Sequence, residues 1–153
     1  MLPFKKILCP TDFSTPSYEA LKAADKLALH FSSELLVVHV VTPVPVVATE
    51  HMMPTAFNVP EYQQQMETSA GILLEDQVKT KVSEKVWTRT LVVVGDPAEQ
   101  IVKIAEDEDV DVIVIATRGQ TGLKRLVFGS VAEKVVRLSP RPVLSIRVPQ
   151  TEG

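Results

Sequence analysis

The stretch VWTRTLVVVGDPAEQIVKIAEDEDVDVIVIA, residues 86–116, contains two apolar runs of strand length with an amphipathic stretch of helix length between them. After the first run, Asp96 predicts a helix N-cap, Pro97 suits the first helical position, and Glu99 completes a capping-box pattern. The second run, 110–116, begins where the helical spacing stops. A strand, a helix and a second strand in this order predict two parallel strands joined by a crossover helix.

The same alternation continues on both sides of this stretch. An earlier helix is predicted with Thr15 as N-cap and Pro16 at its first helical position, and a later one with Ser130 and Glu133 as a second capping box. Helical spacing also runs from 61 to 85, through Tyr62, Met66, Ala70, Leu73 and Val78. Strands are predicted at residues 5–10, 34–41, 86–95, 110–116 and 142–148. This order predicts one α/β domain over residues 1–153, an open five-stranded parallel sheet with helices on both faces, in a Rossmann-like arrangement.

Composition and net charge argue against several classes of protein. The 153 residues carry a net charge of −3, which provides no broad basic surface for nucleic acid or an anionic membrane. No apolar run approaches the roughly 20 residues of a membrane span. The single cysteine, Cys9, excludes an internal disulfide and favours a cytoplasmic location, and its apolar surroundings predict a buried side chain rather than a reactive thiol.

One connection is too long for an ordinary loop. Residues 42–60 contain four prolines and lack a helical or strand period. We expect a mobile flap there, ordered mainly by a ligand or a partner.

A glycine-rich segment, GQTGLKRLVFGSVAEK at 119–134, follows the fourth strand and leads into a helix. In a parallel α/β sheet, ligands bind outside the carboxyl ends of the strands, and a helix N-terminus there presents free N–H groups to an anion. Glycine allows close approach of the backbone, so the segment suits phosphate. The alternative is that Gly119 and Gly122 only form turns and that Ser130 only caps the helix.

Together with three other stretches of the chain, this segment resembles the corresponding sequences of the universal stress protein family. The resemblance rests on KKILCPTDFS, LLVVHV, VVGDPAEQIVKIAEDEDVDVIVIATRG and GSVAEKVVRLSPRPVL, and covers nearly the whole chain. ATP-binding members carry G-x2-G-x9-G-S/T, and this chain reads A-x2-G-x9-G-S, with Ala116 in place of the first glycine. The resemblance implies the strand order 3-2-1-4-5 and an ATP-binding regulatory protein of the stress response. It also implies ATP as ligand, with Mg2+ or Mn2+ held by the phosphates.

The family's binding positions carry over residue by residue. Pro10, Thr11 and Asp12 match residues that border adenine and ribose, and Val40 matches a residue whose backbone reads the adenine edge. Asp12 has an alternative role in an Asx-type turn before the first helix. Ribose and phosphates would lie against Ala116, Thr117, Arg118, Gly119, Gln120, Thr121, Gly122, Gly129, Ser130, Val131 and Ala132.

The sequence does not point to a dedicated enzyme. His30, His39 and His51 have no predictable catalytic partner, so we expect at most slow ATP hydrolysis. A phosphoacceptor receiver domain fits poorly, because only Asp12 follows the first strand. The stronger alternative is an adaptor dimer of the same fold that does not bind ATP and acts on a client protein that the sequence does not name.

The last predicted strand, residues 142–148, alternates between apolar and polar side chains, as expected for a half-covered sheet edge. An exposed edge has unpaired N–H and C=O groups, and two copies of the strand could satisfy them by pairing. The resemblance also implies a homodimer of this kind. The alternative is a monomer whose short edge is protected by Arg147.

Overall fold

A computed structural model describes residues 2–44, 58–117 and 128–148. It contains a five-stranded parallel sheet with the order β3-β2-β1-β4-β5, which confirms the predicted fold class and strand order. The strands are β1 (Lys6–Pro10), β2 (Glu34–Val41), β3 (Thr88–Val94), β4 (Val112–Ala116) and β5 (Val143–Ile146). The helices are α1 (Thr15–Phe31), α3 (Val59–Lys81), α4 (Pro97–Asp107) and α5 (Ser130–Leu138).

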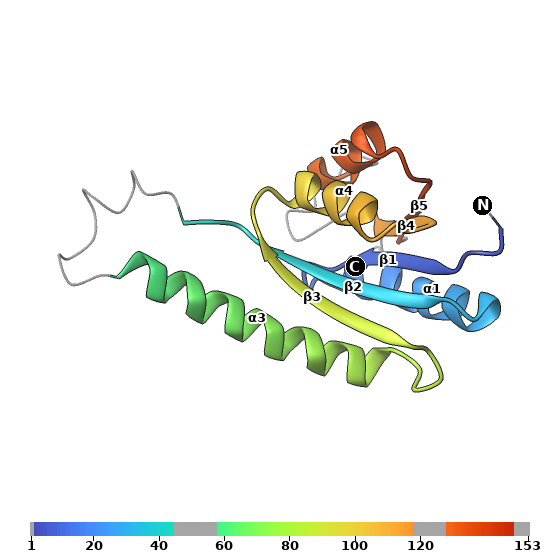
Figure 1. Ribbon diagram of the computed structural model, residues 1–153, viewed down its shortest axis with the longest axis horizontal. Coiled ribbons are helices and arrows are strands. Elements are labelled where there is room, and N and C mark those ends of the chain that lie inside the picture. Colours follow the sequence, from blue (N-terminus) through green and yellow to red (C-terminus); the bar gives the residue numbers. More distant parts are fainter. Residues whose placement is uncertain (1, 45–57, 118–127, 149–153) are drawn as a thin grey trace, which may run out of the picture.

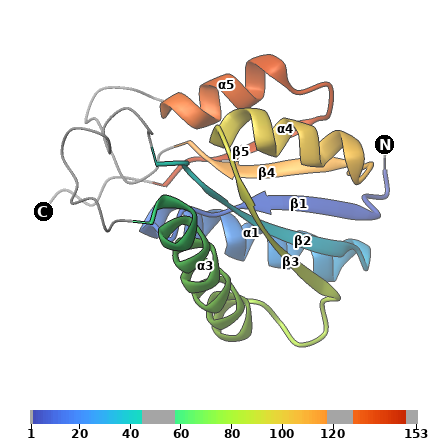
Figure 2. The same ribbon diagram turned by 60° about the vertical axis from the view of Figure 1, so that its left-hand side comes forward.

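Helices cover both faces of the sheet, α1 and α3 on one and α4 and α5 on the other (Figures 1 and 2). Alternate strand residues supply the two cores, because successive side chains of a strand point to opposite faces. In β1, Ile7 and Cys9 pack toward α1, whereas Leu8 packs toward α4 and α5. Cys9 is fully buried, as expected, and burial raises the pKa of its thiol to about 12.

The start of α4 was predicted correctly. The Asp96 carboxylate accepts the Glu99 N–H at 3.0 Å, and Pro97 is the first helical residue. The Glu99 carboxylate instead contacts Lys134 at 3.3 Å, so within the described residues the predicted capping box is not completed. Gly95 before the cap has a φ of +152°, a conformation that L side chains rarely adopt, and an added Cβ would lie 2.8 Å from the Gln100 side chain.

Two other caps differ from the prediction by one residue. Ser14, not Thr15, is the N-cap of α1, and its hydroxyl accepts the Ser17 N–H at 3.4 Å. Gly129, not Ser130, is the N-cap of α5. Backbone conformation selects the cap, and both Ser14 and Gly129 are extended, with ψ near 160°.

The predicted buried face of α3 was wrong in its details. The helix ends at Lys81, before the expected residue 85, and Leu73 is 54% exposed whereas Leu74 is fully buried. Gln77 also lies on the buried face, and among the described residues its amide has no hydrogen-bond partner. A polar residue on that face misleads a prediction that follows apolar spacing alone.

Candidate functional site

The carboxyl ends of β1 and β4 lie side by side at the point where the strand order reverses. From β1 the chain continues through α1 to β2 on one side, and β4 is followed by α5 and β5 on the other (Figure 2). The register pairs Leu8 with Ile113, so Thr11 and Ala116 lie at the same level, three residues further along. In open α/β sheets such a reversal is the usual position of a ligand.

Backbone hydrogen bonds fix the end of β4 to its neighbours. The Thr117 N–H donates to the Ile146 carbonyl of β5 at 3.0 Å, and the Gly129 N–H donates to the Thr117 carbonyl. The first residue before α5 is therefore held directly at the end of β4. Between them, the predicted site residues Arg118, Gly119, Gln120, Thr121 and Gly122 lie outside the described residues.

The start of α5 has no side-chain cap. Its first intrahelical bond runs from the Glu133 N–H to the Gly129 carbonyl at 3.0 Å, so the N–H groups of Ser130, Val131 and Ala132 come before it. Among the described helices, α1, α3 and α4 each begin with a side-chain cap, from Ser14, Asn58 and Asp96 respectively. Burial of Ala132 and Val135 against the sheet holds α5 in place. This helix start can receive an anion.

Gly129 does not need to be glycine for the backbone to turn. Its φ of −69° and ψ of 160° are open to any L residue. The turn alternative concerned Gly119 and Gly122, which lie outside the described residues. Glycine is a favoured N-cap residue, and the missing side chain also leaves the backbone open to close approach of another group.

Ala116 is the last residue of β4, and its side chain belongs to the core beneath α1, with 7% exposure. Among described non-glycine residues, positive φ occurs at Phe13, Ser32 and Asp109. Position 116 therefore does not require a residue that tolerates positive φ, and the methyl group of Ala116 packs in the core.

Thr11 and Asp12 form a turn that leads from β1 into α1. The Asp12 carboxylate accepts the Ser14 N–H at 3.0 Å and also the Ser14 hydroxyl, an Asx-type arrangement. The Thr11 hydroxyl lies 3.1 Å from the Ser17 hydroxyl and is buried. The alternative role predicted for Asp12 is therefore present, and it places this carboxylate at the carboxyl end of β1, after Pro10.

Phe13 and His39, neither of which was predicted as a site residue, also contribute to this turn. Phe13 has a φ of 64°, which for a bulky side chain costs on the order of 1–3 kcal/mol. Its ring lies 4.5 Å from the His39 ring, with an interplanar angle of 32°. His39 Nδ1 lies 2.8 Å from the Thr11 carbonyl oxygen. No sequence pattern signals these contacts.

The other candidate residues are less informative. Val40, within β2, pairs with Val93 and packs toward the α4 face. His30 lies in the last turn of α1 against Phe31, and His51 lies outside the described residues, as does most of the predicted flap. The last two residues of that flap, 59 and 60, belong instead to α3. Within residues 2–44, 58–117 and 128–148, no group of three His, Cys, Asp or Glu side chains is arranged to hold a metal. None of the helices described there is long and apolar enough to cross a bilayer.

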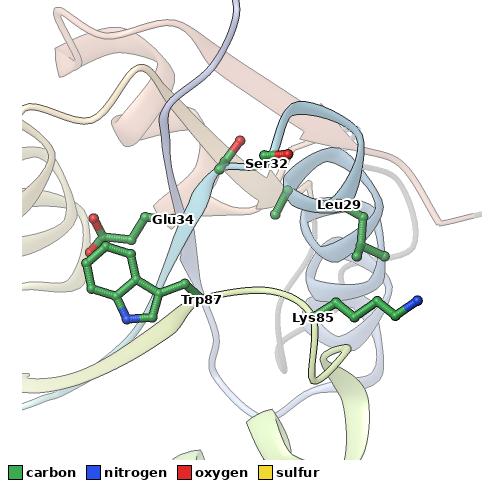
Figure 3. A pocket seen from close by; sticks show the side chains of 7 residues that line it. Leu29, Ser32, Glu34, Lys85 and Trp87 are labelled. Atoms are coloured by element: carbon green, nitrogen blue, oxygen red, sulfur yellow. The ribbon is translucent and has the colours of Figure 1, made fainter.

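A surface pocket of about 330 Å³ lies at the other end of the sheet (Figure 3). It is near the amino ends of β2 and β3, away from the ends of β1 and β4. The Glu34 carboxylate at its edge is already paired with Arg89 and Lys6. The pocket is lined by Ala28, Leu29, Ser32, Ser33, Glu34, Lys85 and Trp87. We do not assign the candidate site to it, because the strand ends and the uncapped helix lie elsewhere.

Comparisons with known proteins match one family over nearly the whole chain. The model of the universal stress protein family matches residues 3–147. Universal stress protein MJ0531 of Methanocaldococcus jannaschii is 34% identical over 149 residues, covering 97% of this chain and 85% of that protein. MJ0577 of the same organism is 32% identical over 154 residues, covering 94% and 95%. A solved structure of MJ0577 matches with a TM-score of 0.82 and 33% identity, over 96% of this chain and 98% of the other.

Two more distant structures share the fold at 20% identity. One is a universal stress protein in complex with cAMP, with a TM-score of 0.66 and coverage of 95% and 98%. The other is the universal stress protein from Archaeoglobus fulgidus in complex with dAMP, with a TM-score of 0.57 and coverage of 95% and 99%.

Proposed function

This chain belongs to the universal stress protein family, and we propose that it is a cytoplasmic regulatory protein that binds ATP at the carboxyl ends of β1 and β4. The observation that carries the proposal is the uncapped start of α5, held against the end of β4 by the bond from Gly129 to Thr117. An oxyanion there would accept N–H groups that lack intrahelical partners, at the positive end of the helix dipole.

In this arrangement the phosphates lie along Gly129, Ser130, Val131 and Ala132. The missing Cβ at Gly129 leaves space for a phosphate oxygen to approach the backbone. Arg118, Gly119, Gln120, Thr121 and Gly122, in the intervening segment, complete the proposed contacts to ribose and phosphates, together with Ala116 and Thr117.

The adenine and ribose would occupy the space beside Pro10, Thr11 and Asp12, with the backbone of Val40 at the base edge. A Mg2+ or Mn2+ ion would enter with the nucleotide, held by its phosphates. The cAMP and dAMP complexes of two family members support an adenine nucleotide as the class of ligand. Those two proteins are only 20% identical to this chain. The proposal that this chain binds ATP therefore depends on its own residues.

Replacing Gly129 with valine tests the phosphate site. The backbone conformation at this position accepts a side chain, so the variant should fold, whereas its branched side chain should obstruct the phosphates. We expect ATP affinity by isothermal titration calorimetry to fall at least about tenfold, about 1.4 kcal/mol. Gly71→Val is the matched control, because nothing lies within 4 Å of a Cβ built at Gly71 in α3. A folded Gly129→Val protein with parental affinity would place the phosphates elsewhere.

Mass spectrometry of nucleotide released by denaturation from protein purified without added ligand separates this function from the adaptor alternative. Co-purified ATP or AMP supports binding. An empty protein that also fails to bind ATP in titration supports an adaptor dimer instead.

We also propose that the chain forms a homodimer through β5. Leu144 is 39% exposed on this edge strand, and Val136 and Leu138 are exposed on the neighbouring helix α5. Residues 142 and 146 direct their carbonyls to β4, where they accept the N–H groups of Ile113 and Thr117. Since peptide groups alternate in direction along a strand, those of Val143, Ser145 and Arg147 point away from β4. They are the groups available to a second copy.

A further inference from the structure

We infer that His39 is a positioning residue for the nucleotide site: its imidazole contacts both ends of the turn that carries Asp12 and fixes that turn in the binding conformation. This inference rests on the proposed ATP function. In this role His39 acts through Thr11 and Phe13 and does not itself contact the phosphates.

The first contact is a hydrogen bond to the backbone. His39 Nδ1 lies 2.8 Å from the Thr11 carbonyl oxygen. A carbonyl oxygen only accepts, so Nδ1 carries the proton and donates it. The paired register of β1 and β2 ends at Pro10 and Val38, and the Thr11 N–H still reaches the Val38 carbonyl at 2.8 Å. His39 therefore binds the peptide group at which the chain leaves the sheet.

The second contact is with the strained residue of the same turn. Phe13 adopts a φ of 64°, which persists only where the surroundings determine it. Its N–H donates to the Thr11 hydroxyl at 3.1 Å, and its ring lies 4.5 Å from the His39 ring. The Phe13 side chain also packs against the core beneath α1, so the ring has a defined place.

Asp12 lies between these two contacts. Its carboxylate is turned toward Ser14, the N-cap of α1. If the imidazole no longer held Thr11 and Phe13, the strained turn could relax and the direction of Asp12 would change with it. His39 and Val40 are consecutive in β2, so the two side chains point to opposite faces of the sheet. His39 thus acts from the α1 face, whereas Val40 packs toward α4.

Three substitutions separate the hydrogen bond from the ring. His39→Asn keeps an N–H donor near the position of Nδ1, His39→Gln moves the donor outward, and His39→Phe keeps a ring without a donor. The control is His30→Asn, which removes an imidazole from the last turn of α1, away from the turn. ATP affinity of each purified full-length protein is measured by calorimetry, and the free energy of unfolding by urea denaturation. A long-range 1H–15N NMR spectrum of the parent gives the tautomer of His39.

We expect the Nδ1–H tautomer in the parent. ATP affinity should fall about tenfold or more in His39→Gln and His39→Phe, as expected when a hydrogen bond that fixes the site is lost. His39→Asn should remain within about threefold of the parent, because it keeps the hydrogen bond to Thr11 and loses only the weaker ring contact with Phe13, and His30→Asn should be unchanged. Rescue by Asn but not by Gln distinguishes positioning from bulk stability, because both amides lack the ring.

The outcomes separate this inference from the proposed function. If the parent itself binds no ATP, the proposed function is wrong and the inference falls with it. If the parent binds ATP and folded His39→Gln or His39→Phe binds equally well, the inference alone is wrong. An Nε2–H tautomer, or a loss of affinity in His39→Asn as large as in His39→Gln, overturns it as well. If His39→Phe does not fold, the Asn and Gln pair decides the question.

Discussion

The orientation of α3 on the sheet can be tested with two neighbouring leucines. Leu74 is fully buried among residues of β1, β2 and α1, whereas Leu73 is 54% exposed on the same helix. Alanine at either position keeps high helix propensity, so helix formation itself changes little. The two substitutions remove the same atoms and differ in what those atoms contact.

The expected costs differ severalfold. Leu74→Ala removes buried methyl groups and leaves a cavity, a change that costs about 3 kcal/mol in well-packed cores. Leu73→Ala removes atoms that are largely in water already and should cost less than about 1 kcal/mol. For a chain of this size, the buried substitution should lower the thermal midpoint by about 6–12 °C.

Urea denaturation followed by circular dichroism at a fixed protein concentration measures both costs, because the proposed dimer would make the midpoint depend on concentration. The slope m should stay at the parental value in both variants, so that the midpoint alone reports stability. Equal costs, or a larger cost for Leu73→Ala, would mean that α3 is rotated about its axis from the position described above.

Two further predictions concern the dimer and the charged residues near the amino ends of the strands. Ser145→Pro should shift the parental dimer toward monomer in sedimentation at tens of micromolar, because it removes an N–H that points away from β4. Ser145→Ala keeps that N–H and should remain dimeric. A monomeric parent, or a proline variant that stays fully dimeric, would exclude the β5 interface. A hydrogen bond from Arg89 lowers the pKa of Glu108 below the ordinary 4.5, so the stabilisation by this carboxylate is complete above pH 4.5 and is lost as the pH falls through the lowered value. Glu108→Gln should therefore cost no more than about 1 kcal/mol at pH 7, since the pair is partly exposed, and the difference from the parent in urea denaturation should shrink toward pH 3; a difference that grows on acidification would contradict the assignment.

The alternation of strand and helix periods over the whole chain predicted a parallel sheet with helices on both faces, whereas the strand order came from the resemblance to the family. The start of α4 could be located because Asp96 is a capping residue and Pro97 suits the position directly after it. At α1, Ser14 and Thr15 are both capping residues before Pro16, and at α5 the neighbours Gly129 and Ser130 both suit a helix start. Only the backbone angles decide between such pairs, and a sequence does not contain them.

The contacts around His39 could not have been predicted for a related reason. His39 and Phe13 are 26 positions apart in the sequence, and they meet because Phe13 takes a positive φ that its residue type disfavours. Local propensity disfavours such a conformation, and tertiary packing overrides that preference at this turn. A departure of this kind at a candidate site is consistent with a functional constraint there.

Ala116 and Gly129 show why a motif needs the conformation of each of its residues. In the family pattern both positions are glycine, and Ala116 is the one departure of this chain from that pattern. Ala116 ends a strand, has no positive φ and packs its methyl group into the core, so glycine is not required there by the backbone. Gly129 also has an ordinary φ, yet it stands before an uncapped helix at the end of β4, where a side chain would meet an approaching anion. We therefore expect a side chain added at position 129 to affect the proposed ATP binding more than the alanine at 116 does.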